Sequence, residues 1–268
     1  MLWIRTLFVI FFFAFAKAEL SYAQSTNTAV EKLQSLPLEV DQFIGVDNFK
    51  NTYFVKGTTL HKTGTRSDHQ FTALQLGKVT SVDILNPLKI TVFYESANTV
   101  VILDNTLTEI TRVNFSTLEN FRNINRATTA SDRRIWIFNT DLQQLEIFDY
   151  SNLKVITQFP PMKRLPLGQT SNFNFCWILT EDGVYTYNAY GSFLHKRTLE
   201  DGVSIAQDNG NLMVKTTNKL VYKPKGIASF EALELPEFPV KQFSLNNEIL
   251  YIYSGQTMTS YLLKSAKN

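Results

Sequence analysis

Cysteine and histidine are both scarce in this chain. One cysteine among 268 residues permits no intramolecular disulfide and no metal cluster held by cysteines. The three histidines form no His-x-His or His-x-x-x-His pair, so a zinc site has no local support. The sequence therefore predicts neither a metal nor any other cofactor.

A charge excess and the common catalytic motifs are also missing. Lys and Arg number 26 against 24 Asp and Glu, which disfavours a nucleic-acid binder. With 44% hydrophobic and 19% charged residues, the composition is that of a globular protein and excludes a disordered chain. Since the chain holds no Gly-x-Ser-x-Gly elbow, P-loop or dinucleotide fingerprint, we expect a protein that is not an enzyme.

The long apolar run needed for a membrane helix is absent, but a shorter run stands at the start. Residues 7–16 form an apolar stretch of ten, against about 20 needed to cross a bilayer. Ser21-Tyr22-Ala23 follows as a small-x-small cleavage site. We expect a signal peptide over residues 1–23 and a mature chain from Gln24. Because the run is too short, no membrane span is expected, and because no cysteine follows it, no lipid anchor is expected.

A period near 40 residues organises the rest of the chain. Apolar runs rich in Val, Ile, Phe and Tyr recur with steps of 39, 44, 41, 36 and 38 between central positions. The central positions are Tyr53, Val92, Trp136, Trp177, Met213 and Tyr251. A second run follows each one after a turn, and leading and third runs flank most of them. The pattern predicts six units of four strands.

Six four-stranded units predict an all-β fold, a six-bladed β-propeller over residues 40–268. Blades that pack face to face cover their middle strands on both sides, which explains continuous apolar runs without alternation. A β-sandwich, or two stacked β-domains, is the alternative architecture.

The sixth unit lacks its outer strand, because only five residues follow Leu263. An open sheet edge is a liability that proteins cover. We expect the N-terminal segment, residues 24–39, to supply the missing strand through residues 28–38 and so to close the ring. The spacing of Val30, Leu33 and Leu36 also fits a short helix.

Several carboxylates at or near the ends of predicted strands are candidates for acid–base groups. They are Asp83, Asp104, Asp149 and the pair Glu181-Asp182. Two carboxylates with separated pKa values could perform general acid–base chemistry. An aspartate at a strand end is more often a turn former, and we interpret each of them in that way.

One connection stands out as a candidate for binding a partner. Residues 159–168, FPPMKRLPLG, lengthen the link between the third and fourth units and combine prolines, positive charges and apolar side chains. Long loops of this composition are often functional, although a stiff connection is the plainer interpretation. The predicted partner-binding residues are Pro160, Pro161, Met162, Lys163, Arg164 and, from a second basic group, Arg133.

One block of the sequence resembles a known family. Residues 76–94, LGKVTSVDILNPLKITVFY, are similar to a Gly-Lys-Ile-Thr-x-Val-Asp-x-x-Asn-Pro-Leu-Lys-Ile motif of an uncharacterised family of exported β-propellers of the Bacteroidota cell envelope. Residues 99–107 continue the resemblance. Some exported propellers of this phylum accompany the type 9 secretion machinery, so the resemblance implies an envelope protein with that association.

Together these features predict a non-catalytic, protein-binding propeller. We expect an accessory subunit of an outer-membrane complex such as a secretion translocon, located in the periplasm at the inner face of the outer membrane. Its expected partners are proteins of that machinery, not nucleic acid. The alternative is a propeller enzyme or glycan-binding protein with a polar site at the channel mouth.

Overall fold

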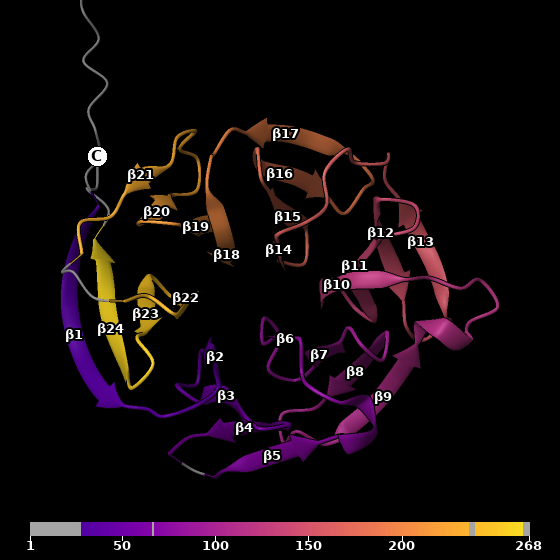
Figure 1. The fold of residues 1–268 in the computed structure, drawn as a ribbon, viewed down its shortest axis with the longest axis horizontal. Helices are drawn as coiled ribbons and strands as arrows, with labels where there is room; N and C mark the ends of the chain where they lie inside the picture. The colour runs from indigo at the N-terminus through magenta and orange to yellow at the C-terminus, as the bar shows by residue number, and fades with distance from the viewer. Residues whose placement is uncertain (1–27, 66, 236–238, 265–268) are drawn as a thin grey trace, which may run out of the picture.

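The chain folds into a ring of six four-stranded antiparallel sheets (Figure 1). The computed structural model describes residues 28–65, 67–235 and 239–264. The predicted signal peptide lies outside these residues. The six-bladed β-propeller is confirmed, and the β-sandwich alternative is wrong, because each sheet is a separate blade around one axis.

Each of the first five blades is a meander that runs outward from the ring axis. Blades one to three consist of β2 (Gln42–Val46), β3 (Thr52–Lys56), β4 (Thr59–Thr63) and β5 (His69–Thr72); β6 (Ser81–Asp83), β7 (Ile90–Tyr94), β8 (Thr99–Leu103) and β9 (Glu109–Asn114); and β10 (Ile124–Thr129), β11 (Arg134–Asn139), β12 (Gln144–Asp149) and β13 (Lys154–Gln158). Two 3₁₀ turns, η1 (Leu74–Leu76) and η2 (Phe115–Thr117), follow the first and second blades.

The remaining blades follow the same order. They consist of β14 (Gly168–Ser171), β15 (Phe175–Thr180), β16 (Gly183–Asn188) and β17 (Phe193–Arg197); β18 (Gly202–Asp208), β19 (Asn211–Thr216), β20 (Leu220–Lys223) and β21 (Glu231–Ala232); and β22 (Gln242–Asn246), β23 (Ile249–Tyr253) and β24 (Thr257–Lys264) with β1 (Ala29–Pro37).

The N-terminal strand β1 completes the sixth blade. It pairs antiparallel with β24 over eight residue pairs, from Ala29 opposite Lys264 to Pro37 opposite Thr257. Figure 1 shows β1 along the outer edge of β24. The segment is therefore a strand and not a short helix. The first and last described strands share one sheet, which closes the ring.

The core consists of an apolar cluster at each of the six contacts between blades. Alternate residues of β11 pack against the two neighbouring blades. Ile135 and Ile137 pack toward blade two, whereas Trp136 packs toward blade four. All three side chains are fully buried. Burial on both faces is the physical reason why the middle strands read as continuous apolar runs.

The six inner strands all run in the same direction along the axis. Their first residues meet, as where the Phe43 amide donates to the side chain of Gln242 at 2.6 Å. Their last residues also meet, as where the Asn246 side chain donates to the Val46 carbonyl at 3.0 Å. The ring therefore has one end where inner strands begin and an opposite end where they finish.

Candidate functional site

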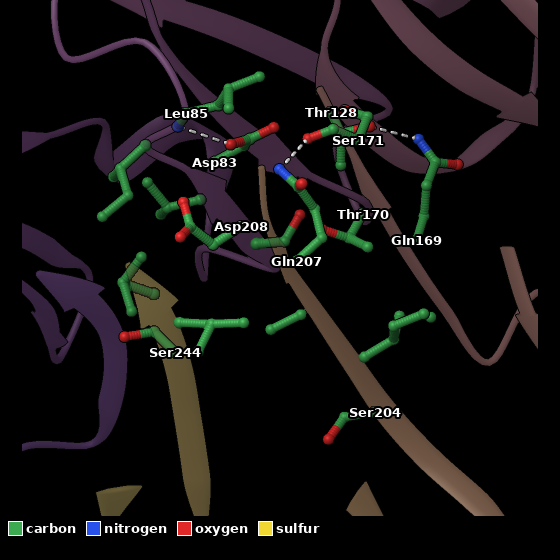
Figure 2. A pocket seen from close by; sticks show the side chains of 18 of the residues that line it. Asp83, Leu85, Thr128, Gln169, Thr170, Ser171, Ser204, Gln207, Asp208 and Ser244 are labelled. Atoms are coloured by element: carbon green, nitrogen blue, oxygen red, sulfur yellow. Dashed lines mark hydrogen bonds between the residues drawn. The ribbon is translucent and has the colours of Figure 1, made fainter. Parts of the chain in front are cut away.

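A cavity of about 1010 Å³ occupies the axis of the ring. Residues of all six inner strands line it, and most of the lining side chains are polar or half-buried. Figure 2 shows part of this lining, with Asp83, Gln207 and Asp208 close together and Ser204 further along its strand. Concave sites that are formed before binding and carry a few polar groups are where small ligands bind in proteins.

A belt of hydrogen bonds ties neighbouring blades together near the end of the inner strands. Its members join a side chain of one blade to the backbone of the next: Thr129 N to Asp83 Oδ2 at 2.8 Å, Ser171 Oγ to Thr129 O at 2.7 Å, Gln207 Nε2 to Ser171 O at 2.8 Å and Asn246 Nδ2 to Val46 O at 3.0 Å. Because these bonds fix the inner strands relative to one another, the cavity wall is held in place before any ligand arrives.

Carboxylates line the cavity at the end where the inner strands finish. We call Asp47, Asp83 and Asp208, from blades one, two and five, the acidic mouth. Asp47 is 4% exposed and accepts hydrogen bonds from its own turn and from the Tyr53 hydroxyl. Burial raises the pKa of both Asp83 and Asp208. Among the described residues, none of the three forms a salt bridge.

Cations line the cavity at the opposite end. We call Arg126, Lys215 and Lys241, from blades three, five and six, the basic mouth. Glu95 lies there too, and its charge acts on Arg126. Lys215 belongs to this end because it pairs with Ser204 near the start of β18. Within the described parts of the chain, these three cations form no salt bridge either.

The raised pKa of Asp83 predicts a pH-dependent stability. Burial holds this pKa above the ordinary value of 3.8, although amide hydrogen bonds from Thr129 and Leu85 oppose the shift. A carboxyl whose pKa is higher in the folded state than in the unfolded state stabilises the folded state when it is protonated. This stabilisation is complete below the pKa of the unfolded state and is lost as pH rises through the pKa of the folded state. Relative to Asp83→Asn, the free energy of unfolding of the wild type should therefore fall as pH rises from about 4.

Urea unfolding across this pH range measures the difference between the two proteins. A matched control is Asp182→Asn, because the hydrogen bond from the Lys196 ammonium, 2.6 Å away, lowers the pKa of Asp182. Relative to Asp182→Asn, the wild type should have the higher free energy of unfolding above the unfolded pKa of this carboxyl, and the difference should decline as pH falls. If the free energy of unfolding of the wild type, relative to Asp83→Asn, stays constant or rises with pH, the buried placement of the Asp83 carboxyl is contradicted.

The predicted partner-binding loop lies at the basic end of the ring, where it joins β13 to β14. Phe159 and Met162 are buried in the cluster between blades three and four. The guanidinium of Arg126 donates to the carbonyls of Pro166 and Leu167 at 3.2 and 3.1 Å. These contacts hold the loop at both ends and leave Pro160, Pro161, Lys163, Arg164 and Leu165 exposed.

Two of the predicted partner-binding residues do not join this exposed surface. Met162 is only 6% exposed, since its side chain fills the space between two blades and anchors the loop. Arg133 is exposed but lies in the β10–β11 turn, at the acidic end of the ring. The structure therefore brings together the loop residues and separates Arg133 from them.

The other candidates have structural roles. Asp104 and Asp149 accept amide hydrogen bonds within their own turns, as expected for turn formers. The three histidines lie on β4, β5 and β17, and none of them lines the cavity. Cys176 is fully buried, and burial raises the pKa of its thiol, which makes it unreactive.

Membrane helices and metal clusters are not found in the described ranges. No described helix is long and apolar enough to cross a membrane. The same ranges hold no group of three or more His, Cys, Asp and Glu side chains that could hold a metal ion.

Sequence analysis singled out Asp83 but missed Asp47 and Asp208. A signal for them does exist, because each of the three aspartates stands at or just after the end of the first strand of a blade. Aligning the repeats by their leading strands would have placed all three at the same end of the ring. The basic mouth has no such signal, because Arg126, Lys215 and Lys241 occupy different repeat positions.

Known proteins resemble this chain in fold, but they do not show which family it belongs to. No protein-family model matches the chain, and no curated protein matches it. Many solved structures are similar in fold. Virginiamycin B lyase from Staphylococcus aureus has a TM-score of 0.63 at 12% identity and covers 88% of this chain and 100% of its own.

Two further solved structures are also similar. BamB from Moraxella catarrhalis has a TM-score of 0.58 at 10% identity, over 90% of this chain and 99% of its own. PorZ, an essential bacterial surface component of the type-IX secretion system of Porphyromonas gingivalis, has a TM-score of 0.53 at 11% identity, over 89% of this chain and 39% of its own. The neighbours thus include both an enzyme and a surface component of a bacterial secretion system.

Proposed function

We propose that this protein is a non-catalytic, protein-binding propeller, an accessory subunit of an outer-membrane complex such as a secretion translocon. The observation that carries this proposal is the loop over residues 159–167. Its buried anchors hold an exposed strip of Pro160, Pro161, Lys163, Arg164 and Leu165. A loop that is ordered before binding loses little conformational entropy when a partner docks.

The chemistry of the strip suits a protein surface. Leu165 is 53% exposed and lies beside two cations. Arg164 pairs with Glu181 at 2.6 Å while both side chains stay more than half exposed, so its guanidinium is oriented without being removed from solvent. Apolar contact area together with arginine is typical of protein–protein interfaces.

The proposed location is the periplasm, at the inner face of the outer membrane. The signal-peptide pattern at residues 1–23 and the resemblance of residues 76–94 to an envelope family support it. PorZ, a bacterial surface component among the structural neighbours, is consistent with an envelope location at the level of the fold. The type 9 association and the Bacteroidota origin belong to this proposal.

The test is affinity purification of the tagged full-length protein from gently solubilised native envelopes, followed by mass spectrometry. We expect an envelope protein at stoichiometric yield. The double variant Lys163→Glu/Leu165→Glu should reduce that recovery at least tenfold, because losing central contacts typically costs about 2 kcal/mol or more.

A matched control separates loop binding from general surface effects. Leu88→Glu matches the Leu165→Glu half of the double variant, because it places one glutamate on a leucine that is 62% exposed at the acidic end of the ring, and it should leave recovery unchanged. Equal recovery with all variants would refute the loop as the binding surface. Recovery of the protein alone would favour the alternative, an enzyme or glycan binder, for which the polar axial cavity is the specific observation.

A further inference from the structure

The axial cavity has charges of opposite sign at its two ends. Seven charged residues line it: Asp47, Asp83 and Asp208 at the acidic mouth, and Arg126, Lys215 and Lys241 with Glu95 at the basic mouth. None of them forms a salt bridge among the described residues. Low-dielectric walls concentrate such a field along the axis.

The spacing of the charges sets the length of a matching ligand. Along β18, Lys215 is paired with Ser204, and Asp208 follows Ser204 by four residues. Four strand residues span about 13 Å. A ligand that satisfies both mouths therefore needs a cationic and an anionic group roughly this far apart, which is the length of about four extended peptide residues.

The wall between the mouths offers partners for a peptide backbone. Hydroxyl and amide side chains line it from several blades, among them Ser81, Thr170, Ser204 and Gln207. These groups can donate or accept, as an extended peptide requires because its amides present both functions. The belt of inter-blade hydrogen bonds holds part of this wall in place.

We propose that the axial cavity binds a short extended peptide with free termini, its ammonium at the acidic mouth and its carboxylate at the basic mouth. A ligand of one charge sign would be repelled at one of the two ends. The exposed strip of the proposed function, Pro160 to Leu165, lies outside the cavity lining, although Leu167 of the same loop lines the cavity. Peptide binding and partner binding are therefore measured separately.

The acidic mouth would recognise the ammonium through two carboxylates. Asp83 already accepts hydrogen bonds from the Leu85 and Thr129 amides. Asp208 accepts from the Asn209 side chain at 3.2 Å and from the backbone amides of Asn247 and Glu248. Neither has a cation partner in the described chain. A bound ammonium would stabilise their charged forms, which burial disfavours in the free protein.

Four versions of one neutral tetrapeptide, Gly-Ala-Ser-Ala, test the proposal with the full-length protein. They are the free peptide, the N-acetylated peptide, the C-amidated peptide and the doubly blocked peptide. Saturation-transfer NMR titrations give a dissociation constant for each. We expect the free peptide to bind at least fivefold more tightly than either singly blocked form, and the preference to shrink as salt rises.

Two variants test which mouth of the cavity binds each terminus of the peptide. Asp208→Asn should become less sensitive to N-acetylation but remain as sensitive as the wild type to C-amidation, and Lys215→Gln should show the reverse. Asp132→Asn and Lys219→Gln, exposed and outside the cavity lining, serve as controls and should behave as the wild type.

Each unfavourable outcome overturns the proposal. It fails if the free peptide shows no saturable binding up to about 10 mM, which corresponds to a binding free energy of only roughly 3 kcal/mol. It also fails if the blocked peptides bind as well as the free one. Thermal unfolding of each variant shows whether it is folded, and the partner-capture experiment remains an independent measure of the loop.

Discussion

Removal of β1 should lower the melting temperature of the ring by about 10 °C or more and cause aggregation. The strand makes eight residue pairs with β24, and each backbone hydrogen bond contributes about 0.5–1.5 kcal/mol. A loss of about 5 kcal/mol follows, and each 1 kcal/mol shifts the midpoint by about 2–4 °C in a chain of this size.

The uncovered edge of β24 explains the expected aggregation. Leu263 on this strand is 3% exposed and packs in the cluster that Val30 of β1 helps to cover. Without β1, an eight-residue strand would present unpaired backbone groups beside apolar side chains, a template for pairing with another chain.

A chain that begins at Val40 should be compared with one that begins at Gln24, the expected mature start. Differential scanning calorimetry gives the melting temperatures, and size-exclusion chromatography reports the association state. Nearly equal melting temperatures would show that the ring does not depend on closure by the N-terminal strand. Adding a peptide of residues 24–39 in trans should restore part of the loss, because it can occupy the same edge.

The number of blades could be predicted because of how propellers bury their strands. Residues 135–138 form a continuous apolar run because blades two and four cover the opposite faces of this strand. Six such runs at a regular period define six blades. The inner strands carry no comparable signal, because one of their edges faces the axial cavity and most of their residues are half-buried.

The candidate sites were harder to predict because they depend on contacts between blades. Met162 looks like a surface residue in its proline-rich segment, yet it is buried, because a gap between blades three and four receives it. Arg133 lies 30 residues before Lys163, and the number of intervening strands puts it at the opposite end of the ring. Strand direction, which can be counted along the sequence, would have separated these two; the burial of Met162 could not be derived in that way.

A second large effect is expected for the buried ion pair of blade three. Arg122 Nε donates to Glu146 Oε2 at 2.8 Å, and the Glu146 side chain is fully buried. The other carboxylate oxygen accepts from the amides of Gln144 and Gln158 at 3.0 and 3.3 Å. Glu146 therefore depends on Arg122 as its only cation partner among the described residues.

Arg122→Met should destabilise the protein by about 3–5 kcal/mol, because it leaves a buried charge without its partner. The double variant Arg122→Met/Glu146→Met should recover about half of that loss, since it removes the charge but leaves the two glutamine amides unpaired. Urea unfolding of the wild type, both single variants and the double variant gives the coupling free energy.

The exposed pair Arg112–Glu109 provides the contrast within the same fold. Its side chains are 37% and 29% exposed, so Arg112→Met should cost less than about 1 kcal/mol. The Glu109 side chain is 29% exposed whereas the Glu146 side chain is fully buried, so the comparison tests the effect of burying the carboxylate. A cost for Arg122→Met as small as that for Arg112→Met would mean that water or a rearranged side chain reaches Glu146, and that blade three tolerates a charge in its interior.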